Sequence, residues 1–361
     1  MPSAQAARIR PALLRGCNLA KDLGSKQGSL TTAERNARLA DWKEPRCPPS
    51  VSPPSTSRTS SPGSSSTRTS TPQVAIKDGW DVNKTYFTIL DEASKKVAGK
   101  LIHSLKADVI ALQEVENFDT LRRFRGEYLG GPSKFPYSIL IDGNDPRLID
   151  VAILSRHPIV RVRSNQHLRS GNSYLFSRDC LEVELDVGGS PLHLLINHFK
   201  SMLDKKDPKN GRRNTCARRE LQSKTVKEIV TARFGNQAGK NPFIVLEDLN
   251  DYLETDAAGS TGIAEIVTWN QVENVVERRP AGDRWTHYFR EKAAPLKESY
   301  KELDYLLVSK SLAANTDTVP EIARKGLMTL ATRYTGPRFP EVGEKTPVAS
   351  DHCPVVLDLT L

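Results

Sequence analysis

The sequence predicts a layered α/β (α+β) fold, and two observations predict it. Apolar runs of strand length recur along the chain, and segments with helical periodicity lie between them. Helices interleaved with this many strands are typical of layered α/β domains. The expected strands lie at 108–112, 150–155, 181–187, 191–199, 242–250, 303–309 and 353–361.

Two helices are expected between these strands. Val97, Leu101 and Leu105 fall on one face of a helix over 84–106, and a similar apolar spacing marks a helix over 217–233. No run of eighteen apolar residues exists in the 361-residue chain, so no transmembrane helix is expected.

The N-terminal part of the chain differs in composition from the rest. Residues 50–72 hold 15 Ser/Thr and 4 Pro, too little apolar surface to offset the entropy of ordering. We therefore predict a disordered linker or insertion over 50–79. The main domain is expected at 80–361, and the segment 1–49 is expected to hold at most a first strand near 12–19.

The net charge and the cysteine content point neither to a nucleic-acid-binding surface nor to a zinc or disulfide framework. Most of the net charge of +9 lies in residues 1–79, which hold 12 Lys/Arg against 5 Asp/Glu, so bulk charge is weak support for a nucleic-acid surface. The five cysteines are widely spaced without a CxxC motif, which argues against a zinc or disulfide framework. No clear secretory signal is visible, and an intracellular location is the default expectation.

Polar clusters follow the apolar strands at several places. They are "ALQEVEN" (111–117), "NHFKS" (197–201), "EDLN" (247–250), "LDY" (303–305) and "SDH" (350–352). Strand ends can build a rigid rim for a site. Their residue types fit one chemistry, with oxygen ligands for a hard cation and histidines for proton transfer.

These five motifs in this order resemble the endonuclease/exonuclease/phosphatase superfamily, over about residues 80–361. The superfamily includes pancreatic-type deoxyribonucleases, abasic-site endonucleases, inositol-phosphate phosphatases and neutral sphingomyelinases. "ALQEVEN", "NDPRLIDVAILSR" and "NHFKS" are most similar to a bacterial-type extracellular nuclease branch. The resemblance implies a two-sheet β-sandwich flanked by helices, in four layers, with 80–361 as the catalytic domain.

The resemblance also implies metal ligands. Glu114 matches the glutamate that binds Mg²⁺, with Mn²⁺ as an alternative metal, and Asp351 matches an aspartate near the metal. Asn18 is the best candidate for an asparagine that usually ends the first strand of the family.

Five residues match catalytic positions. Asp248 matches the residue that positions or deprotonates the attacking water, and Asn250 matches its phosphate-binding partner. His352 matches the histidine at the scissile phosphate, and Asp304 matches the carboxylate that orients it. His198 matches a candidate general acid for the leaving oxygen.

Further residues are expected to contact substrate or to support the site. Arg178, Asn197, Lys200 and Arg219 are the candidates for substrate contact, and Asp150 is a candidate support for His198.

Each assignment has a structural alternative. In isolation, Glu114 would be a surface residue and His198 a structural histidine, and only the company of the other motifs favours a functional role. The stretch 205–219 carries seven Lys/Arg against one Asp, which fits a phosphate-binding loop or a merely solvated one. Within "RWTHYF" (284–289), at least two aromatic residues are expected to pack in the core rather than to stack on bases.

Two positions depart from the branch, which usually has glycine there. Glu247 stands before the D-x-N pair, where a second carboxylate would disturb Asp248 by its like charge. Leu148 stands where a positive φ would strain any residue other than glycine.

Three functions remain open on the sequence alone. The first is a metal-dependent phosphodiester hydrolase, a nuclease with a DNA or RNA substrate. The second is the same chemistry on a phosphoinositide or sphingomyelin head group. The third is a weakened, non-catalytic relative that binds nucleic acid or a partner, which the Glu247 substitution and the poor first strand motivate.

Overall fold

The computed structural model describes residues 8–9, 11–15, 92–255, 261–291 and 297–361. The Ser/Thr/Pro-rich segment, Asn18 and residues 84–91 of the expected first helix lie outside these described residues. All described elements belong to one compact unit of the chain.

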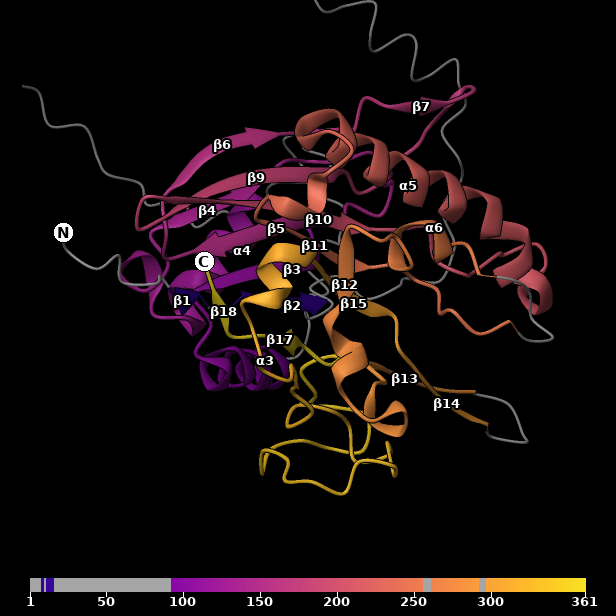
Figure 1. The fold of residues 1–361 in the computed structure, drawn as a ribbon. Helices are drawn as coiled ribbons and strands as arrows, with labels where there is room; N and C mark the ends of the chain where they lie inside the picture. The colour runs from indigo at the N-terminus through magenta and orange to yellow at the C-terminus, as the bar shows by residue number, and fades with distance from the viewer. Residues whose placement is uncertain (1–7, 10, 16–91, 256–260, 292–296) are drawn as a thin grey trace, which may run out of the picture. The chain divides into compact units, whose positions relative to one another are not determined.

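Two six-stranded sheets form the frame of this unit (Figure 1). Sheet I has the strand order β16-β17-β2-β3-β5-β4. Its strands span Glu321–Ile322 (β16), Val355–Val356 (β17), Pro11–Arg15 (β2), Val109–Val115 (β3), Asp150–Ser155 (β5) and Tyr137–Leu140 (β4).

Sheet II has the strand order β12-β15-β11-β10-β9-β6. Its strands span Val272–Asn274 (β12), Asp304–Ser309 (β15), Phe243–Asp248 (β11), Ser190–His198 (β10), Cys180–Val187 (β9) and Ile159–Arg163 (β6). Each sheet has one parallel pair among the described strands, β2 with β3 and β10 with β11. A parallel pair needs a crossover connection, and the long helix α5 (Gly211–Phe234) connects β10 to β11.

The main hydrophobic core lies between the two sheets. Alternate residues of β3 and β5, such as Ala111 and Ile153, pack with alternate residues of sheet II, such as Ile196, Leu246 and Leu306. Successive side chains of a strand point to opposite faces, so every second residue of these strands lies in the inter-sheet core. Because the opposite faces of the same strands are also buried, both sheets need a cover.

Helices cover the outer faces of the sheets. Val97 and Leu101 of α3 (Glu92–Leu105) and Leu121 of α4 (Phe118–Tyr128) share a core with Ile110 of β3. On sheet II, α5 packs through Val226 and Val230 against residues of β10, β11 and β15. Figure 1 shows α3 and α5 on opposite sides of the strands. A mixed α/β fold with two main sheets and helices, as the sequence predicts, is thereby confirmed.

Smaller elements complete the unit. Two more short helices are α6 (Ala264–Val267) and α7 (Lys310–Ala314), and single 3-10 turns span Gly131–Ser133, Pro208–Asn210, Ala238–Lys240, Val275–Arg278 and Ala281–Asp283. Three two-stranded pairs join β1 (Arg8–Ile9) to β18 (Leu359–Thr360), β7 (Arg169–Ser170) to β8 (Ser173–Tyr174) and β13 (His287–Arg290) to β14 (Glu298–Lys301). Among the described residues, no helix has the length and apolar character needed to cross a membrane.

Two element boundaries differ notably from the prediction. The expected strand 353–361 is broken into β17 and β18, which pair in different sheets. Helix α5 begins at Gly211, six residues before the expected start, because the basic stretch forms its first turns instead of a loop.

Candidate active site

The polar motifs of sheet II meet in one row at one edge of that sheet. His198 ends β10 and Asp248 ends β11, and the two residues are direct neighbours across the parallel pair. Asp304 begins the antiparallel strand β15 and lies opposite Asp248. Three separated motifs therefore occupy neighbouring positions on three adjacent strands.

This row faces the space between the two sheets. His198, Asp248 and Asp304 alternate in register with Ile196, Leu246 and Leu306, which are all residues of the inter-sheet core. Glu114, from the end of β3 in sheet I, reaches the same place: its Oε1 lies 4.0 Å from His198 Nε2. The site is thus a polar end to the apolar core.

The contacts within the site are short. His198 Nε2 lies 3.5 Å from Asp248 Oδ2, and His352 Nδ1 lies 2.7 Å from Asp304 Oδ2. One ligand atom each of Asp248, Asp304 and His352 lies within 4.8 Å of the others. The Asp304–His352 contact is the arrangement in which a carboxylate orients an imidazole through Nδ1.

Asn250 is fixed at the same edge by two contacts. Its backbone N–H donates to Asp248 Oδ1 at 2.9 Å, and its Nδ2 donates to the carbonyl oxygen of Phe199 at 3.2 Å. The backbone of Asn250 has a φ of 52° and that of Glu114 a φ of 58°. The register between β3 and β5 also shifts between Leu112 and Val115, which marks a bulge at Glu114. Such strained backbone collects at functional sites.

The site concentrates buried negative charge. Glu114, Asp248 and Asp304 each expose at most 4% of their surface. Several buried carboxylates cost free energy unless cations neutralise them. The donor set of carboxylate oxygens is the type that a hard divalent cation takes, so the residues present fit such an ion.

Arg178 is a buried cation that interacts with Glu114 and Asp248 of this cluster. Burial lowers its pKa to about 10, while Asp145, Glu114 and Asp248 act in the opposite direction. Its Nη1 lies 3.2 Å from Asp145 Oδ2, and its Nη2 donates to the Phe199 carbonyl that also accepts from Asn250. Arg178 therefore braces the loop after β10 and adds positive charge beside the carboxylates.

Asp150 supports a neighbouring loop. Its Oδ1 accepts a hydrogen bond of 2.8 Å from the backbone N–H of Gly143. Burial, together with Asp142, Asp145 and Asp179, raises the pKa of Asp150 to about 7. The described contact of Asp150 is thus with this loop rather than with His198.

Asn197 does not face the site, contrary to the expectation that it contacts substrate. It alternates with His198 and lies on the same face as Leu195, toward α5. Its Nδ2 donates to Glu247 Oε1 at 3.2 Å, so Glu247 lies on this outer face as well. Burial raises the pKa of Glu247 well above its usual range, and this residue does not add a second carboxylate beside Asp248.

Arg219 is fully buried, which disagrees with a direct contact to substrate. Its Nε lies 2.8 Å from Asp251 Oδ2, and Arg212 holds the other oxygen of the same carboxylate at 2.7 Å. The two arginines fasten α5 to the loop after β11. Lys200 is partly exposed, and its Nζ donates to the carbonyls of Ser201 and Leu203. Burial, with Arg178, Arg219 and Arg147, lowers the pKa of Lys200 to about 8.

The structure adds His287, which the sequence interpretation missed. Its ring centroid lies 4.4 Å from that of His352, and its Nε2 lies 3.8 Å from Asp351 Oδ2. His287 lies within "RWTHYF", a segment whose aromatic residues were considered for base stacking while its histidine was not. Trp285 and Tyr288 are buried in the core, as expected for two of those aromatics, and Phe289 is exposed.

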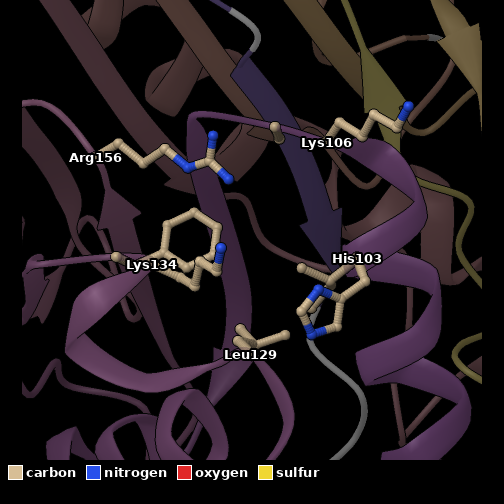
Figure 2. A pocket seen from close by; sticks show the side chains of 8 residues that line it. His103, Lys106, Leu129, Lys134 and Arg156 are labelled. Carbon is tan, nitrogen blue, oxygen red and sulfur yellow. The ribbon is translucent and has the colours of Figure 1, made fainter.

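A separate small cavity lies at the other end of β3. Figure 2 shows the basic side chains of His103, Lys106, Lys134 and Arg156 around Leu129. The cavity has a volume of about 100 Å³. The residues His103 and Lys106 precede β3, whereas Glu114 lies near its end. The Arg156 guanidinium lies over the Phe135 ring and pairs with Asp108 at 3.1 Å. The cavity is therefore distinct from the carboxylate and histidine cluster.

A model of the Endonuclease/Exonuclease/phosphatase family matches residues 66–328. The chain belongs to this family. It is accordingly a phosphoesterase of the endonuclease/exonuclease/phosphatase type, a family that generally uses a divalent metal. The matched range ends before Asp351 and His352, so their place in the site comes from the fold.

Solved structures of low sequence identity are similar in fold. An endonuclease/exonuclease/phosphatase from Beutenbergia cavernae is 13% identical with a TM-score of 0.52, and the alignment covers 98% of this chain and 72% of that chain. TDP2 from Caenorhabditis elegans is 18% identical with a TM-score of 0.47, over 75% and 94% of the chains. A mannosyl-6-phosphatase from Bacteroides thetaiotaomicron is 16% identical with a TM-score of 0.48, over 74% and 91%. No curated protein matches the chain.

Proposed function

We propose that this phosphoesterase is a divalent-metal-dependent nuclease that hydrolyses phosphodiester bonds of DNA or RNA, in the bacterial-type extracellular nuclease branch of its family. The row of His198, Asp248 and Asp304, with His352 held by Asp304, carries the proposal. It places two imidazoles and two buried carboxylates at one end of the core, and these groups can transfer protons during hydrolysis. The helix, sheet, sheet and helix cores support the four-layer arrangement expected for this branch.

The proposed roles follow from the contacts. Asp248 positions and deprotonates the attacking water, and Asn250, fixed beside it, hydrogen-bonds a phosphate oxygen. His352, oriented through Nδ1 by Asp304, presents Nε2 to the scissile phosphate. His198 gives a proton to the leaving oxygen. Arg178 supports the loop of Asn250 and supplies positive charge.

Glu114 is the proposed Mg²⁺ or Mn²⁺ ligand, with Asp351 on the histidine side of the site. Strand β2 is parallel to β3 and pairs Arg15 with Gln113, next to Glu114. Asn18 follows β2 in the sequence and stays a proposed third ligand. When bound, the ion polarises the phosphoryl group and neutralises the charge that develops during hydrolysis.

A long polyanion fits the segment after β10 better than a small head group does. Lys205, Lys206, Lys209 and Arg213 are exposed there, soon after His198 in the chain. Phosphate backbones are bound by such exposed cations in a salt-dependent way. This is the observation that favours a nucleic acid over phosphoinositide or sphingomyelin.

Two features, Glu247 and the poor first strand, motivate the non-catalytic alternative. Glu247 is on the outer face of β11 and bonds Asn197. The N-terminal segment supplies β2, which lies between β17 and β3 in sheet I. Neither feature disturbs the row of His198, Asp248 and Asp304.

Nicking of supercoiled plasmid, with and without Mg²⁺ or Mn²⁺, tests the proposal. We expect metal-dependent nicking that falls by about 100-fold or more in His352→Ala and in Asp248→Ala, since each removes a proton-transfer group. Both variants should keep the unfolding temperature of the wild type within a few degrees. His103→Ala, an exposed histidine of α3, is the matched control and should nick normally.

The other substrates form separate arms of the same experiment. Single-stranded RNA, sphingomyelin vesicles and phosphoinositide vesicles are assayed with the same protein. Hydrolysis of vesicles without nicking would replace the nuclease proposal by a lipid head-group phosphodiesterase. Wild-type activity in folded His352→Ala would show that the proposed roles are wrong.

A further inference from the structure

His287 and the loop of Asp351 and His352 are held together by their backbones. His287 and His352 form an antiparallel bridge. Tyr288 N–H donates to the Asp351 carbonyl at 3.0 Å, and Cys353 N–H donates to the Thr286 carbonyl at 2.6 Å. Because β13 also pairs with β14, the three side chains start from a fixed frame.

The ligand atoms of this group converge. One ligand atom each of His287, Asp351 and His352 lies within 4.8 Å of the others, and His287 Nε2 is 3.8 Å from Asp351 Oδ2. Ligand atoms around a tetrahedral Zn²⁺, at about 2.0–2.1 Å from the ion, are about 3.3 Å apart. Small rotations of the partly exposed His287 and Asp351 side chains would close this difference, whereas His352 is buried.

The donor set differs from that at Glu114. Two imidazoles and one carboxylate favour first-row transition ions, whereas Mg²⁺ prefers oxygen ligands alone. Asp304 bonds His352 Nδ1 at 2.7 Å, which leaves Nε2 as the ligand atom. A carboxylate behind a metal-binding histidine is the usual supporting arrangement at zinc sites.

The surroundings of the group attract and admit a cation. Asp304 and Asp248 lie within reach of His352. The side chain of Asp351 is 43% exposed and that of His287 15% exposed, so one side opens to solvent. Three protein ligands with an open fourth position describe a site that also takes water or an anion.

We propose that His287, Asp351 and His352 form a second metal site that takes a transition ion such as Zn²⁺ and that shares Asp351 with the proposed hard-cation site at Glu114. An ion there withdraws Nε2 of His352 from phosphoester hydrolysis, so Zn²⁺ inhibits the Mg²⁺-dependent reaction. This consequence rests on the proposed function, but the metal site itself does not.

Titration of the metal-free full chain with Co²⁺, followed by its visible absorption, tests the site without a substrate. Co²⁺ in a nitrogen and oxygen site of this kind stands in for Zn²⁺. We expect His287→Phe, which keeps a ring against His352, and His287→Gln each to weaken Co²⁺ binding by at least about tenfold, the scale on which even supporting residues act. Zn²⁺ should displace Co²⁺ from the wild type.

Two control variants separate the two metal sites, because Asp351 takes part in both proposals. Glu114→Gln alters the hard-cation site and should bind Co²⁺ as the wild type does. His103→Gln removes a distant exposed histidine and should also bind normally. Equal Co²⁺ affinity in His287→Phe, His287→Gln and the wild type would overturn the proposal, as would loss of binding in Glu114→Gln with normal binding in His287→Gln.

Inhibition of plasmid nicking by Zn²⁺ tests the functional consequence of the proposed site. In the nicking assay at fixed Mg²⁺, His287→Gln should need at least about tenfold more Zn²⁺ for half inhibition than the wild type. If the wild type nicks no plasmid, the nuclease proposal fails while the Co²⁺ titration still decides the site. If Co²⁺ binding depends on His287 but Zn²⁺ does not inhibit nicking, the inhibitory consequence is wrong.

Discussion

Positive backbone φ angles mark five non-glycine residues of the described chain, and two of them belong to the candidate site. Among the described residues they are Lys106, Glu114, Leu148, Asp179 and Asn250. Glu114 and Asn250 belong to the candidate site, where strain is common. Leu148, with a φ of 55° and 43% exposure, does not. The sequence expectation of strain at this position is confirmed.

Leu148→Gly should stabilise the protein. A left-handed conformation costs a non-glycine residue roughly 1–2 kcal/mol, and the exposed leucine side chain contributes little burial. Since glycine loses more chain entropy on folding, we expect a net gain of about 0.5–1 kcal/mol in the free energy of unfolding, measured by urea titration. Leu203→Gly is the control, because Leu203 is similarly exposed without positive φ, and it should lower stability or leave it unchanged.

Glu247→Gln should preserve hydrolysis, whereas the sequence alone suggested that the like charge of this glutamate disturbs Asp248. Glu247 points away from Asp248 and toward Asn197. A glutamine replaces the neutral acid at similar volume. Glu247→Gly should lower stability by about 1 kcal/mol or more through the lost volume and the flexible backbone, without raising kcat. An increase in kcat in either variant would place Glu247 in the site.

The pH dependence of stability separates Glu247→Gln from the wild type. Burial raises the folded-state pKa of Glu247, so the folded protein keeps a proton that the unfolded chain releases at about pH 4.3. Stability from this residue is therefore lost as pH rises above that value. Denaturation at pH 5 and pH 8 should show a smaller fall for Glu247→Gln than for the wild type.

At the scale of single residues, the sequence motifs predicted which residues lie close together. His352 and Asp304 meet at 2.7 Å although 48 positions separate them. His287 could not be found in this way, because its importance depends on a backbone bridge to His352 that no local pattern encodes. Arg219 was misassigned because a basic stretch does not reveal which cation turns inward to Asp251.

At the scale of elements, the positions of the strands could be predicted from the sequence. Which face of each strand meets the other sheet and which meets the helices was harder to predict. Strand β5 has the expected bounds, and β9, β10, β11 and β15 differ by one or two residues at their ends. Their continuous apolar runs identify buried strands but not which side meets which layer, because both faces are apolar. The edge strands β4 and β6 were missed, since they are partly exposed and carry weaker apolar patterns.

His198→Ala and Asn197→Ala test the face assignment on two consecutive residues of β10. His198→Ala should lower kcat by about 100-fold or more, with little change in the free energy of unfolding. Asn197→Ala should leave kcat within a few-fold but lower stability by about 1–3 kcal/mol, because buried Glu247 loses its donor. Steady-state kinetics and urea titration on both proteins make the comparison. The reverse pattern would mean that β10 is shifted by one residue.

At the scale of the whole molecule, the N-terminus contributes to a sheet built mostly from distant sequence. Strand β2 lies between β17, near the C-terminus, and β3. The sequence indicated a possible first strand near 12–19 but left it outside the catalytic domain, and the family match begins only at residue 66. The predicted domain boundary at 80 leaves this strand outside the catalytic domain, although sheet I contains it.

Two deletions of comparable length distinguish a structural N-terminus from a dispensable segment. Removing residues 1–15 takes away β1 and β2, which exposes the backbone edges of β3 and β17 and interrupts sheet I. We expect this protein to aggregate or to lose cooperative unfolding. Removing residues 50–72 takes out the Ser/Thr/Pro-rich stretch, which has little apolar surface to bury, and should change the unfolding temperature by no more than a few degrees. Cooperative unfolding of the chain without residues 1–15 at the wild-type temperature would show that residues 80–361 fold alone, as the sequence first suggested.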